Sequence, residues 1–176
     1  MQKAMAGRSF SMQREPDMSL KRVFIHGLES TSRGTKGGFF RNKFPDMILE
    51  DFTGPLDQRM DGLDRLLKDQ TDLVLVGSSY GGLMAAIYAC RNPRTVRKLI
   101  LLAPALDLAD FQPYLTFRID IPVVLYHGLL DDVVPPEAVQ AIARTVFNNL
   151  DYHAVEDDHS LHHTFSGMDW DGLLHV

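Results

Sequence analysis

The sequence contains a single cysteine and no long hydrophobic run, and each shortage excludes a class of protein. Cys90 alone cannot form an internal disulfide or a cysteine-based metal cluster, and it ends an apolar segment, 83–90, that is typical of a buried helix. No stretch reaches the ~20 apolar residues that span a bilayer. Residues 1–19 lack the apolar middle of a secretory signal. We therefore expect a cytoplasmic protein with no membrane partner.

Positive charge is also scarce. The 18 lysine and arginine residues are outnumbered by 23 aspartate and glutamate residues, for a net charge of −5. Without a broad positive field, nucleic acid is not expected as a partner, and a small molecule is favoured instead. The sequence has no Walker-type or dinucleotide-type glycine pattern, so we predict no nucleotide cofactor. It carries no signal for an oligomeric state.

The 176 residues, 45% of them hydrophobic, suit one domain with a single core. We predict a domain at 21–176, preceded by a flexible N-terminal extension at 1–20. Apolar runs alternate with segments of helical periodicity, which predicts an α/β fold: a three-layer α/β/α sandwich around a mainly parallel sheet of about six strands. The predicted strands are 22–26, 47–51, 73–77, 98–103, 123–127 and 152–155. The predicted helices are 56–68, 81–91, 136–150 and a short final one around 161–174, and 29–40 is expected to be a mobile loop.

Polar segments follow four of the predicted strands, at 26–28, 77–81, 128–132 and 157–159. Open parallel sheets bind ligands beyond the carboxyl ends of their strands. Because all four segments fall at that edge, we expect their side chains to form one site.

Ser79 stands in a Gly-Ser-Ser-Tyr-Gly turn between an apolar strand and an apolar helix. This context makes the G-x-S-x-G pattern informative as a nucleophile turn. Glycines two residues before and after the serine relieve crowding with neighbouring backbone, and the helix N-terminus favours a developing negative charge. The alternative is an ordinary turn whose serine caps the helix.

A serine hydroxyl needs a base, and histidine suits that task near neutral pH. We predict His159, because it follows the last strand at the same sheet edge. His162 and His163 are expected on the final helix, and His153 inside a strand. The cluster 157–159 with His162 leaves a metal site as an alternative, although no second ligand set is evident.

The base needs a carboxylate that holds its tautomer. Asp131 follows an apolar strand and fits best, with Asp132 and Asp107 as competitors. The chain order is then Ser, Asp, His.

An oxyanion hole needs two backbone N–H groups. Tyr80 follows the nucleophile and supplies one, and we predict Leu28, in the loop after the first strand, for the other. A close backbone approach would explain Gly27, and His26 is expected to make a structural hydrogen bond.

Together these motifs, from His26-Gly27 to Asp158-His159, resemble the α/β-hydrolase superfamily over residues 21 to the C-terminal helix. Within it, the chain is similar to the small, lidless, YqiA-like bacterial esterases. The resemblance implies a Ser79–His159–Asp131 triad, an acyl-enzyme intermediate and a minimal fold without a cap domain, since 106–121 is the only stretch between the fourth and fifth strands.

An uncapped site should be shallow and should favour short or accessible acyl groups. We therefore expect hydrolysis of small carboxylic esters. Thioester hydrolysis, peptidase or transferase chemistry through the same acyl-enzyme, and a catalytically silent binding protein remain alternatives. Arg33 and Lys36 are expected to be solvated loop charges, although they could meet an anionic substrate.

Overall fold

The computed structural model describes residues 20–176, so the predicted extension at 1–20 lies almost entirely outside the described residues. A single sheet runs through the domain with strand order β2-β1-β3-β4-β5-β6, and every neighbouring pair is parallel. This confirms the predicted parallel sheet of about six strands. The strands are β1 (Lys21–Ile25), β2 (Ile48–Leu49), β3 (Leu73–Ser78), β4 (Val96–Leu102), β5 (Val123–Gly128) and β6 (Leu150–Val155).

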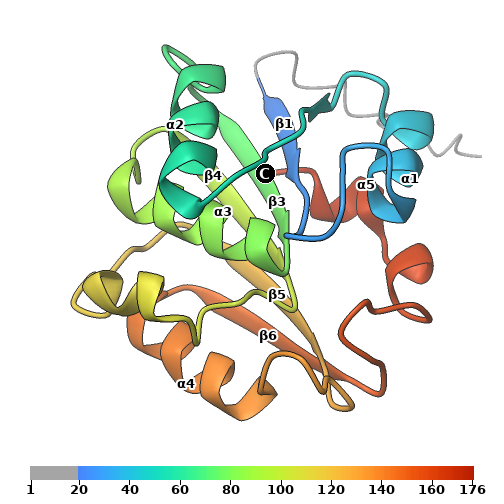
Figure 1. The fold of residues 1–176 in the computed structure, drawn as a ribbon, viewed down its shortest axis with the longest axis vertical. Coiled ribbons are helices and arrows are strands. Elements are labelled where there is room, and N and C mark those ends of the chain that lie inside the picture. Colours follow the sequence, from blue (N-terminus) through green and yellow to red (C-terminus); the bar gives the residue numbers. More distant parts are fainter. Residues whose placement is uncertain (1–19) are drawn as a thin grey trace, which may run out of the picture.

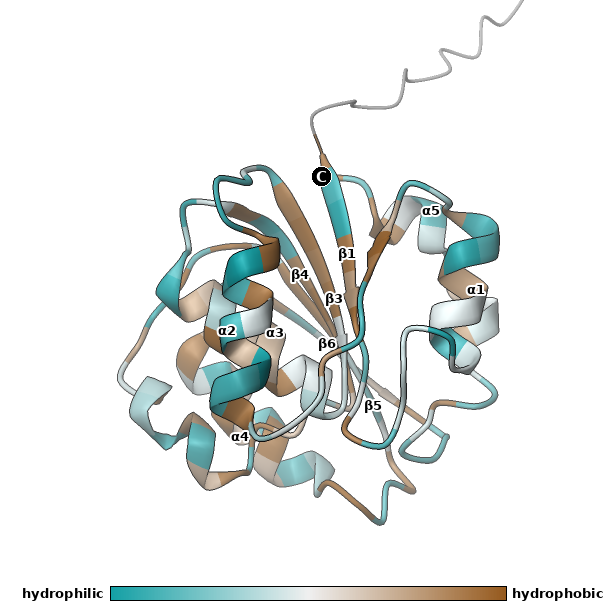
Figure 2. Cartoon of the chain, turned by 45° about the horizontal axis from the view of Figure 1, so that its top comes forward, coloured by the Kyte–Doolittle hydropathy of each residue, from teal (hydrophilic) through white to brown (hydrophobic). Residues whose placement is uncertain are grey.

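Helices cover both faces of the sheet (Figures 1 and 2). One face carries α2 (Leu56–Leu66), α3 (Tyr80–Arg91), α4 (Pro136–Val146) and a 3-10 helix, η1 (Ala109–Tyr114). The other face carries α1 (Thr35–Lys43), α5 (Trp170–Leu173) and a second 3-10 helix, η2 (Phe165–Gly167). The predicted three-layer α/β/α sandwich is therefore confirmed, and residues 20–176 form no cap domain over it.

The central strand β3 shows why an almost wholly apolar run forms a strand here. Successive side chains of a strand point to opposite faces. Leu73 and Leu75 accordingly join the core under α2, α3 and α4, whereas Val74 and Val76 join the core under α1 and α5. A strand with a helical layer on each side needs apolar residues at every position.

The expected buried helix is α3, in which every residue from 81 to 90 is buried. Its glycines and alanines let the helix backbone approach the sheet closely. Cys90 lies at its end, 3% exposed, and burial raises the pKa of its thiol to about 12. It therefore stays a protonated core residue.

Four predicted elements differ from the structure. The loop expected at 29–40 contains the first half of α1, which packs Phe40 into the core between α1, α5 and the sheet. The expected second strand shrinks to Ile48–Leu49, and the helix predicted at 136–150 ends at Val146, just before β6 begins at Leu150. The expected final helix is divided into η2 and α5.

Among residues 20–176, no helix has both the length and the apolar character needed to cross a membrane.

The strand order places a topological switch between β1 and β3. From β1 the chain moves outward to β2, and then returns to the other side of β1 to form β3. The loops after β1 and β3 diverge there and leave a crevice at the carboxyl ends of the strands. Ile25 pairs with Gly77 at this edge, so the segments that follow them begin side by side.

Candidate active site

Ser79 lies in the sharp turn between β3 and α3, with φ 53° and ψ −117°. This backbone conformation is costly for any residue except glycine, and such strain clusters at functional sites. Hydrogen bonds hold the turn: Ser79 N–H donates to Leu102 O at 2.9 Å, and Ser79 O accepts from Ala105 N–H at 3.1 Å. The Ser79 side chain makes no capping bond to α3, so the helix-cap interpretation is wrong.

The glycines that flank the turn are required by crowding, as predicted. A Cβ on Gly81 would overlap the carbonyl oxygens of Ile25 and His26, and a Cβ on Gly77 would overlap the carbonyl of Gly81. These obstacles are backbone atoms, which cannot move without shifting β1 or α3. The close packing therefore fixes the height at which the Ser79 hydroxyl stands above the sheet edge.

A continuous chain of hydrogen bonds joins Ser79, His159 and Asp131. His159 Nε2 lies 2.9 Å from Ser79 Oγ, and His159 Nδ1 lies 2.7 Å from Asp131 Oδ2. An ionised carboxylate only accepts hydrogen bonds, so Nδ1 carries the proton and Nε2 is free to accept the serine hydroxyl. The three residues follow β3, β6 and β5, and the structure brings them together at one edge of the sheet.

Asp131 is surrounded by hydrogen-bond donors. Its Oδ1 accepts from Val133 N–H at 2.9 Å and from Val134 N–H at 2.8 Å, while Oδ2 accepts from His159. Burial alone would raise the pKa of Asp131, but the bonds from Val134, His159 and Val133 outweigh it and hold the pKa below its usual value. The carboxylate is therefore ionised at neutral pH and held in one orientation.

Asp157 organises the loop that carries His159. It is 2% exposed, and its carboxylate accepts from the backbone N–H groups of Asp158 at 2.8 Å, His163 at 3.0 Å and Thr164 at 2.8 Å. Its own carbonyl accepts from Leu130 N–H at 3.0 Å. The loops after β5 and β6 are thus tied to each other beside His159.

Two backbone N–H groups lie in the segments where we predicted an oxyanion hole. Tyr80 is the first residue of α3, where an N–H has no partner within the helix, and Leu28 lies in the turn after β1. A Cβ on Gly27 would stand 3.5 Å from Ser79 Cβ, so the β1 loop does lie against the nucleophile turn. This is an ordinary contact distance, and Gly27 is not required by overlap as Gly81 is.

His26 makes the structural hydrogen bonds that we predicted. It is 2% exposed; its Nε2 accepts from Phe52 N–H at 2.9 Å, and its Nδ1 donates to Gly27 O at 2.7 Å. The second bond holds the Gly27 carbonyl, which belongs to the same peptide unit as Leu28 N–H. His26 therefore fixes the orientation of that peptide.

The competing carboxylates have other surroundings. Asp107 lines the cavity above Ser79, but it makes no hydrogen bond to His159, and its Oδ1 is buried without a partner among residues 20–176. Asp132 is exposed to solvent. Asp131 is the carboxylate that reaches the histidine.

The other candidate histidines make no hydrogen bond to Ser79. His162 bonds the Asp158 carboxylate at 2.6 Å on the surface, and His163 is exposed. Both lie in a turn, so their predicted place on a helix is wrong. His153 lies in β6 as predicted, where its ring stacks on Tyr126 at 4.4 Å.

The alternative of a metal site at 157–159 finds no ligand set. In the part of the chain that the structure describes, no three histidine, cysteine, aspartate or glutamate side chains gather so as to hold a metal ion. Both ring nitrogens of His159 are already engaged by Ser79 and Asp131.

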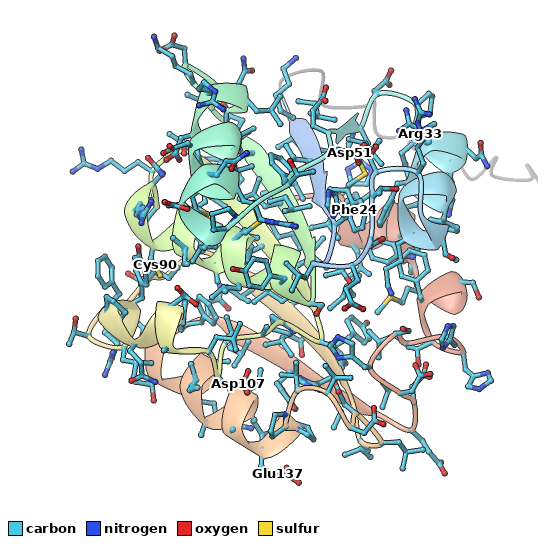
Figure 3. All side chains as sticks on the ribbon, viewed as in Figure 1. Phe24, Arg33, Asp51, Cys90, Asp107 and Glu137 are labelled. Atoms are coloured by element: carbon cyan, nitrogen blue, oxygen red, sulfur yellow. The ribbon has the colours of Figure 1, made fainter. Side chains whose placement is uncertain are left out.

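A cavity of about 680 Å³ opens above Ser79 and His159. This volume suits a drug-sized molecule. Lys36 lines it half-buried, with Nζ donating to Ser160 O at 2.6 Å and lying 5.5 Å from the Phe165 ring centroid. Lys36 is thus not the solvated loop charge that we predicted, whereas Arg33, near α1 in Figure 3, is exposed and does not line the cavity.

Sequence reasoning gave no role to His127, although the structure places it against the acid. His127 is the penultimate residue of β5 and is fully buried, and its Nε2 lies 3.0 Å from Asp131 Oδ2. The signal available in the sequence was a histidine at the end of a buried strand, four residues before the predicted acid.

Comparisons with known proteins agree with this architecture. A family model described as the alpha/beta hydrolase fold matches residues 26–117, just over half of the chain. No curated protein matches by sequence. Among solved structures, a YdeN-like hydrolase from Pectobacterium atrosepticum is 19% identical with a TM-score of 0.69, over 89% of this chain and 87% of that one.

Two further structures show the same likeness. Esterase Pf2001 from Pyrococcus furiosus is 17% identical with a TM-score of 0.69, over 88% of this chain and 80% of that one. Est1E from Butyrivibrio proteoclasticus is 18% identical with a TM-score of 0.65, over 88% and 85%. At such identities the likeness establishes the fold and leaves the substrate to be argued from the site.

Proposed function

Because this chain belongs to the alpha/beta hydrolase family, we propose that it is a serine hydrolase that cleaves carboxylic esters through an acyl-enzyme on Ser79. The observation that carries the proposal is the chain of bonds from Ser79 Oγ to His159 Nε2 at 2.9 Å and from His159 Nδ1 to Asp131 Oδ2 at 2.7 Å. Among the structural neighbours, one is an esterase and another a monoacylglycerol lipase, which supports ester chemistry.

The proposed reaction begins when His159 Nε2 takes the hydroxyl proton of Ser79 as Oγ attacks the ester carbonyl. The Leu28 and Tyr80 N–H groups stabilise the negative oxygen of the tetrahedral intermediate. His159 then gives its proton to the leaving alcohol, and the acyl group stays on Ser79. Water, deprotonated by the same imidazole, attacks the acyl-enzyme, and His159 returns that proton to Ser79 Oγ as the bond to the acyl group breaks and the acid is released.

The cavity supports an ester with an apolar part. Leu28, Leu108 and Val133 line it and remain exposed, and Phe39 and Phe165 line it on the side of α1 and η2. A substrate that covers these side chains removes apolar surface from water, which favours binding.

Covalent labelling tests this function. A fluorophosphonate probe should label the folded protein on the peptide that contains Ser79, as detected by mass spectrometry. Ser79→Ala should abolish both labelling and turnover of p-nitrophenyl butyrate, whereas Ser78→Ala, which removes the neighbouring hydroxyl, should still label. Folded wild-type protein that neither labels nor turns over esters would favour the silent binding protein. Faster turnover of acyl thioesters than of matched oxygen esters would shift the assignment to thioester hydrolysis.

A further inference from the structure

A second histidine shares the acid of the proposed site. His127 Nε2 lies 3.0 Å from Asp131 Oδ2 and 3.1 Å from Val134 O. A carboxylate and a carbonyl are both acceptors, so Nε2 must carry the hydrogen and Nδ1 must hold the lone pair. The partners of His127 thus define its tautomer.

The oxygen that His127 contacts is the one that His159 uses. Asp131 Oδ2 receives His159 Nδ1–H at 2.7 Å and His127 Nε2–H at 3.0 Å. We propose that His127 is a positioning residue of the hydrolase: it holds the Asp131 carboxylate in the orientation that His159 needs, and by sharing Oδ2 it limits how strongly the carboxylate favours the charged form of His159. This inference rests on the proposed function.

The sharing matters because the base must both accept and release a proton. A carboxylate oxygen that accepts a single hydrogen bond interacts strongly with that one donor. Such an oxygen would strongly stabilise the charged imidazolium form of His159. A second hydrogen bond to the same oxygen disperses part of its negative charge and weakens this stabilisation. His159 can then return its proton to the leaving alcohol more readily.

Packing alone does not account for a histidine at this position. The ring is fully buried, and no residue between 20 and 176 bonds to Nδ1. An unpaired polar atom in the interior costs free energy that an apolar side chain of similar size would avoid. The hydrogen bond from Nε2 to Asp131 is an interaction that an apolar side chain could not make.

His127 acts as a neutral donor. Burial lowers the pKa of its ring, and the bonds to Val134 O and Asp131 only partly oppose this. The titratable groups that act on it are Asp131, from the loop after its own strand, and His159, from the loop after β6. Burial therefore favours the neutral form of the ring, in which Nε2 carries the hydrogen that Asp131 accepts.

Because His127 does not line the cavity, its substitution should change turnover and leave substrate binding nearly unchanged. His127→Leu removes the donor, and His127→Gln places an amide N–H near the position of Nε2. The test follows the imidazole of His159 by NMR as a function of pH, alongside the pH profile of kcat/KM. His153→Gln is the control, since His153 lies in β6 with its ring stacked on Tyr126, away from the site.

In His127→Leu we expect the pKa of His159 to rise by about half to one unit, and the acid limb of kcat/KM to move upward with it. The kcat should fall roughly tenfold with KM nearly unchanged. His127→Gln should restore most of both properties, and His153→Gln should match the wild type.

A folded His127→Leu variant with unchanged His159 titration would overturn the proposal. So would a His127→Gln variant that loses as much kcat as His127→Leu without any shift, because that pattern indicates packing. If His127→Leu does not fold, nitrogen chemical shifts of the wild-type ring decide: Nε2 must be protonated and Nδ1 bare at neutral pH. The NMR titration needs no turnover, so it remains informative even if the protein hydrolyses no ester.

Discussion

Asp131 meets only donors, and this determines how a substitution there must act. Two backbone N–H groups point at Oδ1, and two imidazole N–H groups point at Oδ2. An asparagine would keep one oxygen but would turn an NH2 group toward one of these pairs. His159 would then lose its orienting acceptor, or the loop after β5 would lose its turn.

We therefore predict that Asp131→Asn lowers kcat by roughly 10³- to 10⁴-fold, since the wrong tautomer of His159 becomes favoured. Asp107→Asn is the matched comparison, because Asp107 lines the same cavity without bonding His159. It should change kcat by less than about tenfold. Steady-state kinetics with p-nitrophenyl esters, on variants shown by circular dichroism to be folded, measures both. A crippled Asp107→Asn beside a mild Asp131→Asn would reverse the assignment of the acid.

At the scale of elements, the site depends on how close the carboxyl ends of β5 and β6 lie to each other. Gly128 is the last residue of β5 and pairs with Val155 of β6. A Cβ on Gly128 would overlap the carbonyl oxygens of Asp157 and Asp158, which precede His159. The overlapping atoms are backbone atoms and not the ends of flexible side chains, so a side chain at residue 128 would force the backbone of one loop to move.

Gly128→Ala should lower the free energy of unfolding by about 1–3 kcal/mol, the usual cost of overpacking a tight contact. It should also reduce kcat, because the loops that carry Asp131 and His159 are forced apart. Gly38→Ala in α1 is the control: a Cβ there meets nothing within 4 Å, and alanine is the better helix former. Urea unfolding of both variants tests this. Equal stability of Gly128→Ala and the wild type would show that the contact is not tight.

The elements that the sequence predicted well are those whose pattern reflects burial on both sides. β1, β3, β4, β5 and α3 each contain a buried apolar run, and their boundaries fall within two residues of the prediction. By contrast, α1 contains Gly37 and Gly38 and lacks a clear apolar stripe. Gly37 is needed because a Cβ there would overlap the backbone of Ser32, in the turn just before the helix, so this glycine reflects a close turn and not an apolar pattern.

For the whole molecule, the switch in strand order explains why distant segments meet. The sequence placed Ser79, Asp131 and His159 at strand ends, and the parallel sheet aligns those ends at one edge. The sequence alone did not decide which carboxylate reaches His159. The loop geometry decides it, because Asp131 bonds His159 and Asp107 does not. Hydrogen bonds such as those of Asp157 and His127 depend on the path of two loops in space, so spacing along the chain could not predict them.

The same buried network makes stability depend on pH. Burial lowers the pKa of His127, so below the unfolded value near 6.5 the unfolded chain binds a proton that the folded protein does not. Burial alone would raise the pKa of Asp131 and of Asp157, but hydrogen bonds hold both below 3.8. The stabilisation from these carboxylates is present above the unfolded value and is lost as pH falls through the folded values.

Stability should therefore decline in two steps on acidification. The free energy of unfolding, measured with urea, should fall between pH 7 and pH 5 by up to about 1.4 kcal/mol per pH unit from His127, and should fall again below about pH 4. His127→Gln does not titrate, so it should flatten the first step and leave the second, whereas His153→Gln should keep both. An identical decline between pH 7 and pH 5 in wild type and His127→Gln would mean that the His127 ring takes up its proton as easily in the folded protein as in the unfolded chain, and its role as a neutral donor would be wrong.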